Sequence, residues 1–181
     1  MPLILAHDLG TTGNKATVFD DQGRLVASHV EHYPVHYAQA GWAEQDPLDW
    51  WRAAGTATRA LLAKGQVSPS DIVAVTFSGQ MMGCVPLDKK ARPLRTAIIW
   101  ADQRAVEQER WVGERISPQE VYRISGHRLS ASYSLQKILW LRDHLKNYRG
   151  GLVVISHDVD LIEQVVNKVF YLDANRSVLD I

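Results

Sequence analysis

The sequence has little cysteine, no long apolar run and no excess of either charge. Its single cysteine, Cys84, excludes a disulfide within the chain and a zinc site built from several cysteines, and it favours a reducing compartment, so we expect a cytoplasmic protein. No stretch approaches the roughly 18–20 apolar residues that cross a bilayer, so no membrane partner is expected. The 20 basic and 20 acidic residues cancel, which argues against a nucleic-acid partner.

What the sequence does have is the composition of a folded globular chain. Of its 181 residues, 46% are apolar and 22% are charged, which is far from the balance of a disordered segment. This length predicts one domain, or one domain with an appendage.

The first thirty residues predict an antiparallel meander of three short strands, at Leu3–Asp8, Lys15–Phe19 and Arg24–Glu31. Glycine-containing turns at 9–13 and 20–23 separate these strands, and glycine accepts the positive φ that such turns need. The chain therefore opens with hairpins and not with a strand–helix–strand unit.

Helices and further strands follow. Asp46 and Pro47 are the cap and first residue expected of a helix, and apolar residues then recur at helical spacing as far as Leu62. Ile72–Phe77 is predicted to be a buried strand, because it is a short, continuous apolar run. We also expect short strands at 84–87 and 96–100, and helices at 102–115, from Ser117 to near Gly126, and at 134–146.

The first turn holds the residue types that bind phosphate. Glycine at Gly10 lets backbone N–H groups approach phosphate oxygens, Thr11 and Thr12 add hydroxyl donors, and Lys15 adds positive charge. Asp8, at the end of the preceding strand, is placed to hold Mg²⁺ beside those phosphates. The spacing is not that of a P-loop, and a plain hairpin with turn-forming Asp and Thr residues is the alternative.

Four blocks in order resemble the FGGY carbohydrate kinase family. The blocks are Asp-Leu-Gly-Thr-Thr-Gly (8–13), Gly-Trp-Ala-Glu-Gln-Asp-Pro (41–47), Ser-Gly-Gln-Met-Met-Gly (78–83) and Ile-Trp-Ala-Asp-Gln-Arg (99–104). The resemblance covers residues 1–144 and implies an α/β fold of the ribonuclease-H-like, actin/hexokinase-like ATPase type. We expect this domain to be incomplete, with the three-strand meander extended by parallel strands and flanked by helices.

The resemblance also implies chemistry. Kinases of this family use ATP and Mg²⁺ to phosphorylate a sugar hydroxyl, so Asp8 would serve the metal and the turn would serve the phosphates. Glycerol kinases carry Arg and Glu after the glutamine of the third block, whereas xylulokinases carry Met and His. Met81 and Met82 therefore favour a ketopentose such as xylulose, although Met82 departs from the usual histidine. The residues implied in the sugar site are Gln80, Met81, Met82, Trp100, Asp102 and Arg104.

Each of these sugar-site residues has a structural alternative. The two methionines are also typical of core packing, and a tryptophan at a strand end is often a core residue. Asp102 and Arg104 are also the charges expected of an exposed pair that opens a helix.

The last segment, 145–181, has a different character. Leu152–Ile155 followed by Ser-His-Asp (156–158) resembles the switch-histidine region of an ATP-binding cassette ATPase. No Walker A motif accompanies His157, so we expect it to end a strand without chemistry. We interpret this segment as a short β-α-β tail joined to the kinase-like part near 143–150, with a strand also at Lys168–Leu172 and another at Ser177–Ile181.

The functional hypothesis is an ATP-dependent carbohydrate kinase with a small sugar as substrate. In the resembling family, the general base and a second domain lie several hundred residues further on, so we expect residues 1–181 to be inactive alone. The alternatives are a non-catalytic sugar-binding or scaffold fragment, and a fragment of a cassette ATPase. An exposed sheet edge would either accept the predicted strand Leu152–Ile155 of the tail or pair two copies of the chain as a homodimer.

Overall fold

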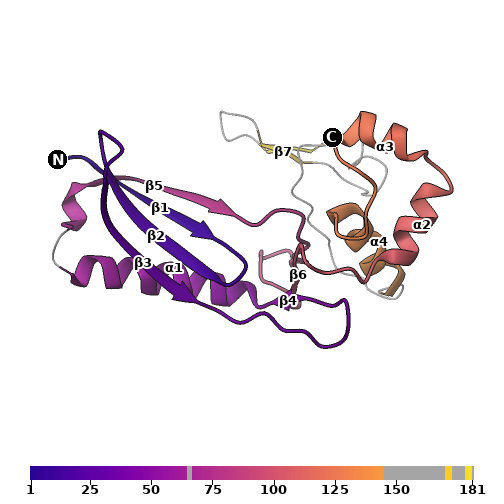
Figure 1. The fold of residues 1–181 in the computed structure, drawn as a ribbon, viewed down its shortest axis with the longest axis horizontal. Coiled ribbons are helices and arrows are strands. Elements are labelled where there is room, and N and C mark those ends of the chain that lie inside the picture. The colour runs from indigo at the N-terminus through magenta and orange to yellow at the C-terminus, as the bar shows by residue number, and fades with distance from the viewer. Residues whose placement is uncertain (65–66, 145–169, 173–177, 181) are drawn as a thin grey trace.

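The computed structural model describes residues 1–64, 67–144, 170–172 and 178–180. Its main feature is a four-stranded sheet in the order β3-β2-β1-β5 (Figure 1). The first three strands run antiparallel as predicted, and β5 lies parallel to β1. The strands are β1 (Leu3–Leu9), β2 (Gly13–Asp20), β3 (Leu25–His32) and β5 (Ile72–Gly79).

Alternating apolar residues set which face of the meander is buried. Leu5 on β1 pairs with Val18 on β2, and both side chains are almost fully buried in one core cluster. Gly13 at the start of β2 is required by close packing, because a Cβ there would lie 2.6 Å from the carbonyl oxygen of Glu31 on β3. The glycine of this turn therefore serves the sheet as well as the turn.

Helix α1 (Pro47–Ala63) covers the apolar face of the meander, along which it runs in Figure 1. The side chain of Asp46 accepts a hydrogen bond from the Leu48 N–H at 2.9 Å, which confirms the predicted cap. Ala57 and Leu61 turn inward and complete the core cluster with the strands. Small residues on this helix let it lie close to the sheet.

The prediction that the 72–77 strand is buried was wrong. On β5, Val73, Val75 and Phe77 are 67%, 54% and 56% exposed. The strand pairs with β1 on one side, and within the described residues no element pairs with its other edge. Phe77 stacks on His7 of β1, with ring centroids 5.0 Å apart, but α1 covers the meander and leaves the rest of this face open.

The remaining elements form a second part with its own core, built around α4. Its strands are β4 (Glu44–Gln45) and β6 (Ala97–Ile98), which pair antiparallel. Its helices are α2 (Val106–Gly113), α3 (Pro118–Ser125) and α4 (Ser134–His144). In the main sheet, a 3₁₀ turn at Pro69–Asp71 lies between α1 and β5. No helix in the described ranges is long and apolar enough to cross a bilayer.

The local signals in this part were only partly right. Ser117 caps α3 and Gly126 ends it with φ 73°, both as predicted. The expected strands at 84–87 and 96–100 shrink to β6 and isolated bridges, such as the one between Cys84 and Ile98. Helix α2 begins at Val106, later than predicted.

Two short strands, β7 (Phe170–Leu172) and β8 (Val178–Asp180), pair antiparallel near the C-terminus. They fall within the ranges 168–172 and 177–181 that the sequence predicts to be strands. The predicted strand Leu152–Ile155 and His157 lie outside the described residues, and the boundary near residue 144 stays a prediction.

Candidate functional site

Asp8 and Lys15 lie side by side on the face of the sheet opposite α1. The register pairs Asp8 with Lys15 on β2 and with Ser78 on β5, and paired residues share a face. Neighbouring His7 is buried on the α1 side, whereas Asp8 and Lys15 are exposed. No hydrogen bond or ion pair within the described part of the chain engages either charged group, so both are free to meet a ligand.

The turn after β1 keeps unused donors. The Gly10 N–H bonds the Gly13 carbonyl at 3.0 Å, and the Tyr33 hydroxyl donates to the Gly10 carbonyl at 2.5 Å. Burial, together with the negative charge of Asp8, raises the pKa of Tyr33 to about 12, so this phenol stays a donor. Among the described residues, nothing bonds the backbone N–H groups of Thr11 and Thr12, which remain available to an anion.

Two predicted sugar residues reach this turn. The indole N–H of Trp100 donates to the Thr11 hydroxyl oxygen at 2.8 Å, and the Gln80 backbone N–H donates to the Leu9 carbonyl at 3.1 Å. The Thr11 hydroxyl therefore accepts from Trp100 and keeps its own hydrogen for a ligand. The 78–83 and 99–104 blocks thus meet the glycine turn in space.

Gln45 on β4 joins the same residues, although it is not among the site residues predicted from the sequence. Its side-chain amide donates to the Thr11 carbonyl at 2.7 Å and accepts from Gln80 Nε2 at 2.7 Å. Gln45 does belong to the second family block, but no spacing rule connects residue 45 with residues 11 and 80.

Met81 and Met82 form a turn after β5, and the two residues differ in exposure. Met81 is 74% exposed, which contradicts a core-packing role for it. Met82 is half-buried and has φ 61°, a left-handed conformation that costs a non-glycine residue about 1–2 kcal/mol. Ser134 and Lys137 on α4 hold this turn, by bonding the carbonyls of Gly83 at 3.0 Å and Met82 at 2.8 Å.

Lys137 is a second residue beside the candidate site that is not predicted from the sequence. Its side chain is fully buried and also bonds the Ser132 carbonyl. Burial lowers its pKa to about 8, although the nearby charge of Asp102 acts in the opposite direction. A lysine in an apolar helical run normally extends to solvent, so helical spacing alone does not reveal this contact.

Asp102 and Arg104 bind each other in the interior. The Arg104 guanidinium forms a two-pronged contact with the Asp102 carboxylate, with its shortest bond at 2.7 Å, and both side chains are 0% exposed. Asp102 also accepts the Ala43 N–H at 2.6 Å, and Arg104 lies 3.6 Å from the Trp42 ring centroid. The alternative interpretation, an exposed Asp102–Arg104 pair that opens a helix, is therefore wrong, because both side chains are buried. A sugar contact by either residue stays a prediction.

Glu44 extends this ion pair into a network. It contacts Arg104 at 2.7 Å and also bonds Arg95 and Thr96. Burial alone would raise the pKa of Glu44, but hydrogen bonds from Thr96 and Arg104 and the charge of Arg95 together hold it below its ordinary value. The network fixes β4 beside β6, which positions Gln45.

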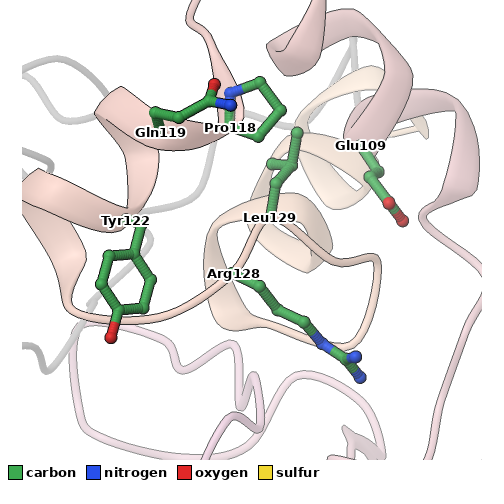
Figure 2. A pocket seen from close by; sticks show the side chains of 6 residues that line it. All are labelled: Glu109, Pro118, Gln119, Tyr122, Arg128 and Leu129. Carbon is green, nitrogen blue, oxygen red and sulfur yellow. The ribbon is translucent and has the colours of Figure 1, made fainter.

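A separate pocket of about 460 Å³ lies at α2 and α3 (Figure 2). Figure 2 shows Tyr122 on α3, Arg128 on the segment after it and Glu109 on α2 around this space. None of the residues predicted to bind sugar or phosphate lines it. Its other lining residues are Pro118, Gln119 and Leu129.

Asp8 fits a magnesium ion better than a metal that needs a cage of side chains. The part of the chain that the structure describes has no group of three or more His, Cys, Asp or Glu residues that could hold a metal. Mg²⁺ commonly binds through one or two carboxylates, with substrate phosphates and waters as its other ligands. The free carboxylate of Asp8, beside the unused donors of the turn, suits this mode of Mg²⁺ coordination.

The chain is similar in sequence to known carbohydrate kinases. A family model described as the N-terminal domain of the FGGY family of carbohydrate kinases matches residues 3–176. A glycerol kinase of Trichormus variabilis is 36% identical over 83% of this chain, and a xylulose kinase of Klebsiella pneumoniae is 36% identical over 78% of it. The chain spans 31% and 29% of the lengths of these two proteins. Glycerol and xylulose kinases are thus equally close.

Solved structures agree on the fold. A kinase from Brucella ovis, described as a xyloylose kinase, superposes with a TM-score of 0.74 at 30% identity, over 80% of this chain and 30% of that one. A ligand-bound xylulose kinase from Lactobacillus acidophilus gives a TM-score of 0.74 at 28% identity, over 81% of this chain and 29% of that one. The predicted α/β fold of the actin/hexokinase-like type, present as a partial domain, is therefore confirmed.

Proposed function

This chain belongs to the FGGY family of carbohydrate kinases, and from that membership we propose that it supplies the phosphate-binding turn and one wall of the sugar site of an ATP-dependent kinase. Such a kinase transfers the γ-phosphoryl group of ATP to a sugar hydroxyl. The observation that best supports this proposal is the 2.8 Å hydrogen bond from the Trp100 indole to the Thr11 hydroxyl. It joins a residue predicted to bind sugar to a residue predicted to bind phosphate. Phosphoryl transfer depends on holding the two reactants at such close quarters.

The free groups of the turn support phosphate binding. The N–H groups of Thr11 and Thr12 and the ammonium of Lys15 would hold the phosphates of ATP, Gly10 would let them approach the turn because it has no side chain, and Asp8 would hold Mg²⁺. Bound ATP and Mg²⁺ supply the phosphoryl group and neutralise its charge. The protein groups orient the phosphates and keep them at a fixed place beside the sugar wall.

The sugar is proposed to be a ketopentose such as xylulose. Met81 exposes a thioether where a glycerol kinase carries a charged residue, and the ammonium of Lys137 is occupied by backbone carbonyls. This turn therefore offers packing surface and weak acceptors in place of a charged clasp. The proposed sugar-site residues are Gln80, Met81, Met82, Trp100, Asp102 and Arg104, of which the last two would act by holding the wall.

Two further proposals concern the setting of the chain. The edge of β5 with which no described element pairs would pair two copies of the chain as a homodimer, because among the described residues it offers unpaired backbone groups and an apolar face. Burial raises the pKa of the Cys84 thiol to about 11, so it stays a neutral thiol that suits a reducing compartment, and the cytoplasm is the proposed location.

Titration of the ¹⁵N-labelled 181-residue chain with D-xylulose and with glycerol tests the sugar site. We expect D-xylulose to shift the amides of residues 80–83 and the Trp100 indole. A coupled ADP-release assay with Mg²⁺ and ATP, run on the same sample, separates a kinase from a non-catalytic fragment. Sugar binding without ADP release supports the non-catalytic sugar-binding fragment, and shifts from neither sugar would contradict the proposed site.

Phosphoryl transfer itself is tested by joining residues 1–144 to the matching remainder of the Klebsiella pneumoniae xylulose kinase. The chimera should phosphorylate D-xylulose, and Asp8→Asn in the chimera should lower the rate roughly 10²-fold or more. Gln22→Met, at an exposed turn remote from the site, is the matched control and should leave the rate unchanged. A chimera that binds D-xylulose but responds equally to both substitutions would contradict the assigned role of Asp8.

A further inference from the structure

The side chain of Gln45 is fully buried and uses every hydrogen-bonding site of its amide. Nε2 donates to the Thr11 carbonyl at 2.7 Å and to the Pro34 carbonyl at 3.3 Å. Oε1 accepts from the Trp50 indole N–H at 3.1 Å and from Gln80 Nε2 at 2.7 Å. An amide has two donor hydrogens and two acceptor lone pairs, so this set of partners fixes its orientation.

The partners of Gln45 come from four segments that are separated along the chain. Thr11 is in the proposed phosphate turn, Gln80 is in the proposed sugar wall, and Trp50 is in α1. Gln45 is 0% exposed, so no water competes for these bonds. Because every hydrogen-bonding site of Gln45 is satisfied, its side chain is held in one orientation, and removing it leaves its partners unpaired.

Gln80 leaves one acceptor open at the end of this network. Its Oε1 is buried and has no hydrogen-bond partner among the described residues. A ligand hydroxyl that donates to this oxygen polarises the Gln80 amide and strengthens the bond from its Nε2 to Gln45. Successive hydrogen bonds reinforce one another in this way in a low-dielectric interior.

The far end of the network is the peptide group between Thr11 and Thr12. Gln45 bonds the Thr11 carbonyl, and the Thr12 N–H belongs to the same conjugated peptide unit. Withdrawing electron density through that carbonyl makes the Thr12 N–H a better donor. This N–H is unused within the described part of the chain, so a phosphate at the turn can accept it.

We propose that Gln45 is the positioning residue that holds the phosphate turn against the sugar wall and transmits sugar binding at Gln80 to the Thr12 N–H. The inference rests on the proposed function, because it requires a sugar at Gln80. It adds a residue that touches neither ligand. It also predicts that sugar binding at Gln80 changes the hydrogen-bonding strength of the phosphate turn.

The test follows ¹H–¹⁵N spectra of the 181-residue chain during titration with D-xylulose. In the unmodified chain, sugar should shift the amides of residues 80–83, the Trp50 indole N–H and the Thr12 N–H. In Gln45→Met, which keeps the length but not the hydrogen bonds, the shifts at 80–83 should persist while the Thr12 shift falls roughly threefold or more. Gln22→Met is the matched control and should respond like the unmodified chain.

The outcomes separate the two claims. A Thr12 shift that is equally large in the unmodified chain and in the Gln45→Met variant overturns the role of Gln45 and leaves the sugar site standing. Absence of any shift at 80–83 in the unmodified chain overturns the proposed function and this inference together. If Gln45→Met does not fold, exchange of the Gln45 side-chain N–H in the unmodified chain decides. It should slow when D-xylulose saturates the site, and unchanged exchange overturns the inference.

Discussion

Lys137 on α4 donates a 2.8 Å hydrogen bond to the carbonyl of Met82, the residue at which the turn after β5 enters the left-handed conformation. The cation also bonds the Ser132 carbonyl and is fully buried. A helix far along the chain therefore holds the backbone of the turn that carries Met81. The strain at Met82 persists because the surrounding contacts over-determine it.

The first prediction concerns how stability changes with pH at Lys137. Burial lowers the pKa of this lysine to about 8, whereas an unfolded lysine titrates near ~10.4. Between these values the unfolded chain binds more protons than the folded chain, so the contribution of Lys137 to the unfolding free energy should increase as pH rises. Urea unfolding at intervals from pH 7 to 10.5 should show this increase, on the order of a few kcal/mol, and Lys137→Met should remove it.

The titration of Cys84 must be removed from that experiment. Burial raises the pKa of its thiol to about 11, so between the unfolded value near ~8.5 and pH 11 it contributes a fall in stability that opposes Lys137. Both proteins should therefore carry Cys84→Ala. The charges of Asp102 and Arg104 also act on Lys137 and remain in both proteins. Parallel pH profiles with and without the lysine would contradict the prediction.

The second prediction is that Arg104 is needed for folding more than for contact with sugar. Its side chain is 0% exposed, bonds Asp102 and Glu44, and lies over Trp42 and Trp140 at 3.6 and 4.9 Å. Arg104→Met leaves the buried Asp102 carboxylate without its paired guanidinium and leaves Glu44 with Arg95 as its cation, and it should cost about 3–5 kcal/mol of stability. Urea unfolding at pH 7 measures this loss.

Arg123→Met is the control for Arg104. Arg123 is 73% exposed, and its partner Glu120 lies on the same turn of α3, so the same substitution should change stability little. Equal losses for the two variants, or a loss of D-xylulose binding at Arg104 without any loss of stability, would argue for a direct sugar contact.

The third prediction concerns which substrate the exposed turn prefers. Replacing Met81 by Arg and Met82 by Glu introduces the charged pair that the family's glycerol kinases carry. Charge-assisted hydrogen bonds to glycerol hydroxyls should raise glycerol affinity by roughly tenfold, and D-xylulose affinity should fall by a similar factor. Affinities come from the same amide titrations. Leu25→Arg, at an exposed position on β3, should change neither affinity, and a double variant that still prefers D-xylulose would count against the methionines as the selecting residues.

The sequence predicted what local signals determine. The three-strand meander follows from alternation and glycine turns, and the start of α1 follows from the Asp46 cap and Pro47. The prediction that β5 is buried was wrong, because a continuous apolar run such as 72–77 occurs both in covered strands and in edge strands. Whether a strand is covered depends on elements elsewhere in the chain.

The candidate site was predictable by residue type but not by connection. Asp8 and Lys15 pair across β1 and β2 and are exposed beside the turn that holds Thr11, and their binding of Mg²⁺ and phosphate stays a prediction. The links through Gln45 and Lys137 were missed, because each joins segments more than thirty positions apart and neither residue forms a motif by itself. Long-range hydrogen bonds of buried polar side chains depend on the packed fold, so local patterns carry no signal for them.

The last prediction concerns the edge of β5 with which no described strand pairs. β5 carries no charged residue from Ile72 to Gly79, whereas the opposite edge, β3, carries Glu31, whose carboxylate lies 3.5 Å from Nε2 of His29. Charged residues on an edge strand discourage pairing with another chain, and β5 lacks them. An antiparallel pairing of two β5 strands about Val75 would place Val73 opposite Phe77 of the second copy. The exposed apolar faces would then join into one surface. Analytical ultracentrifugation should find a concentration-dependent dimer, and Val75→Lys should make it monomeric. Val30→Lys on β3, at a position 45% exposed, is the matched control and should leave the dimer intact. A chain that stays monomeric at high concentration, or a dimer that Val30→Lys disrupts as strongly as Val75→Lys, would show that β5 is not the pairing edge.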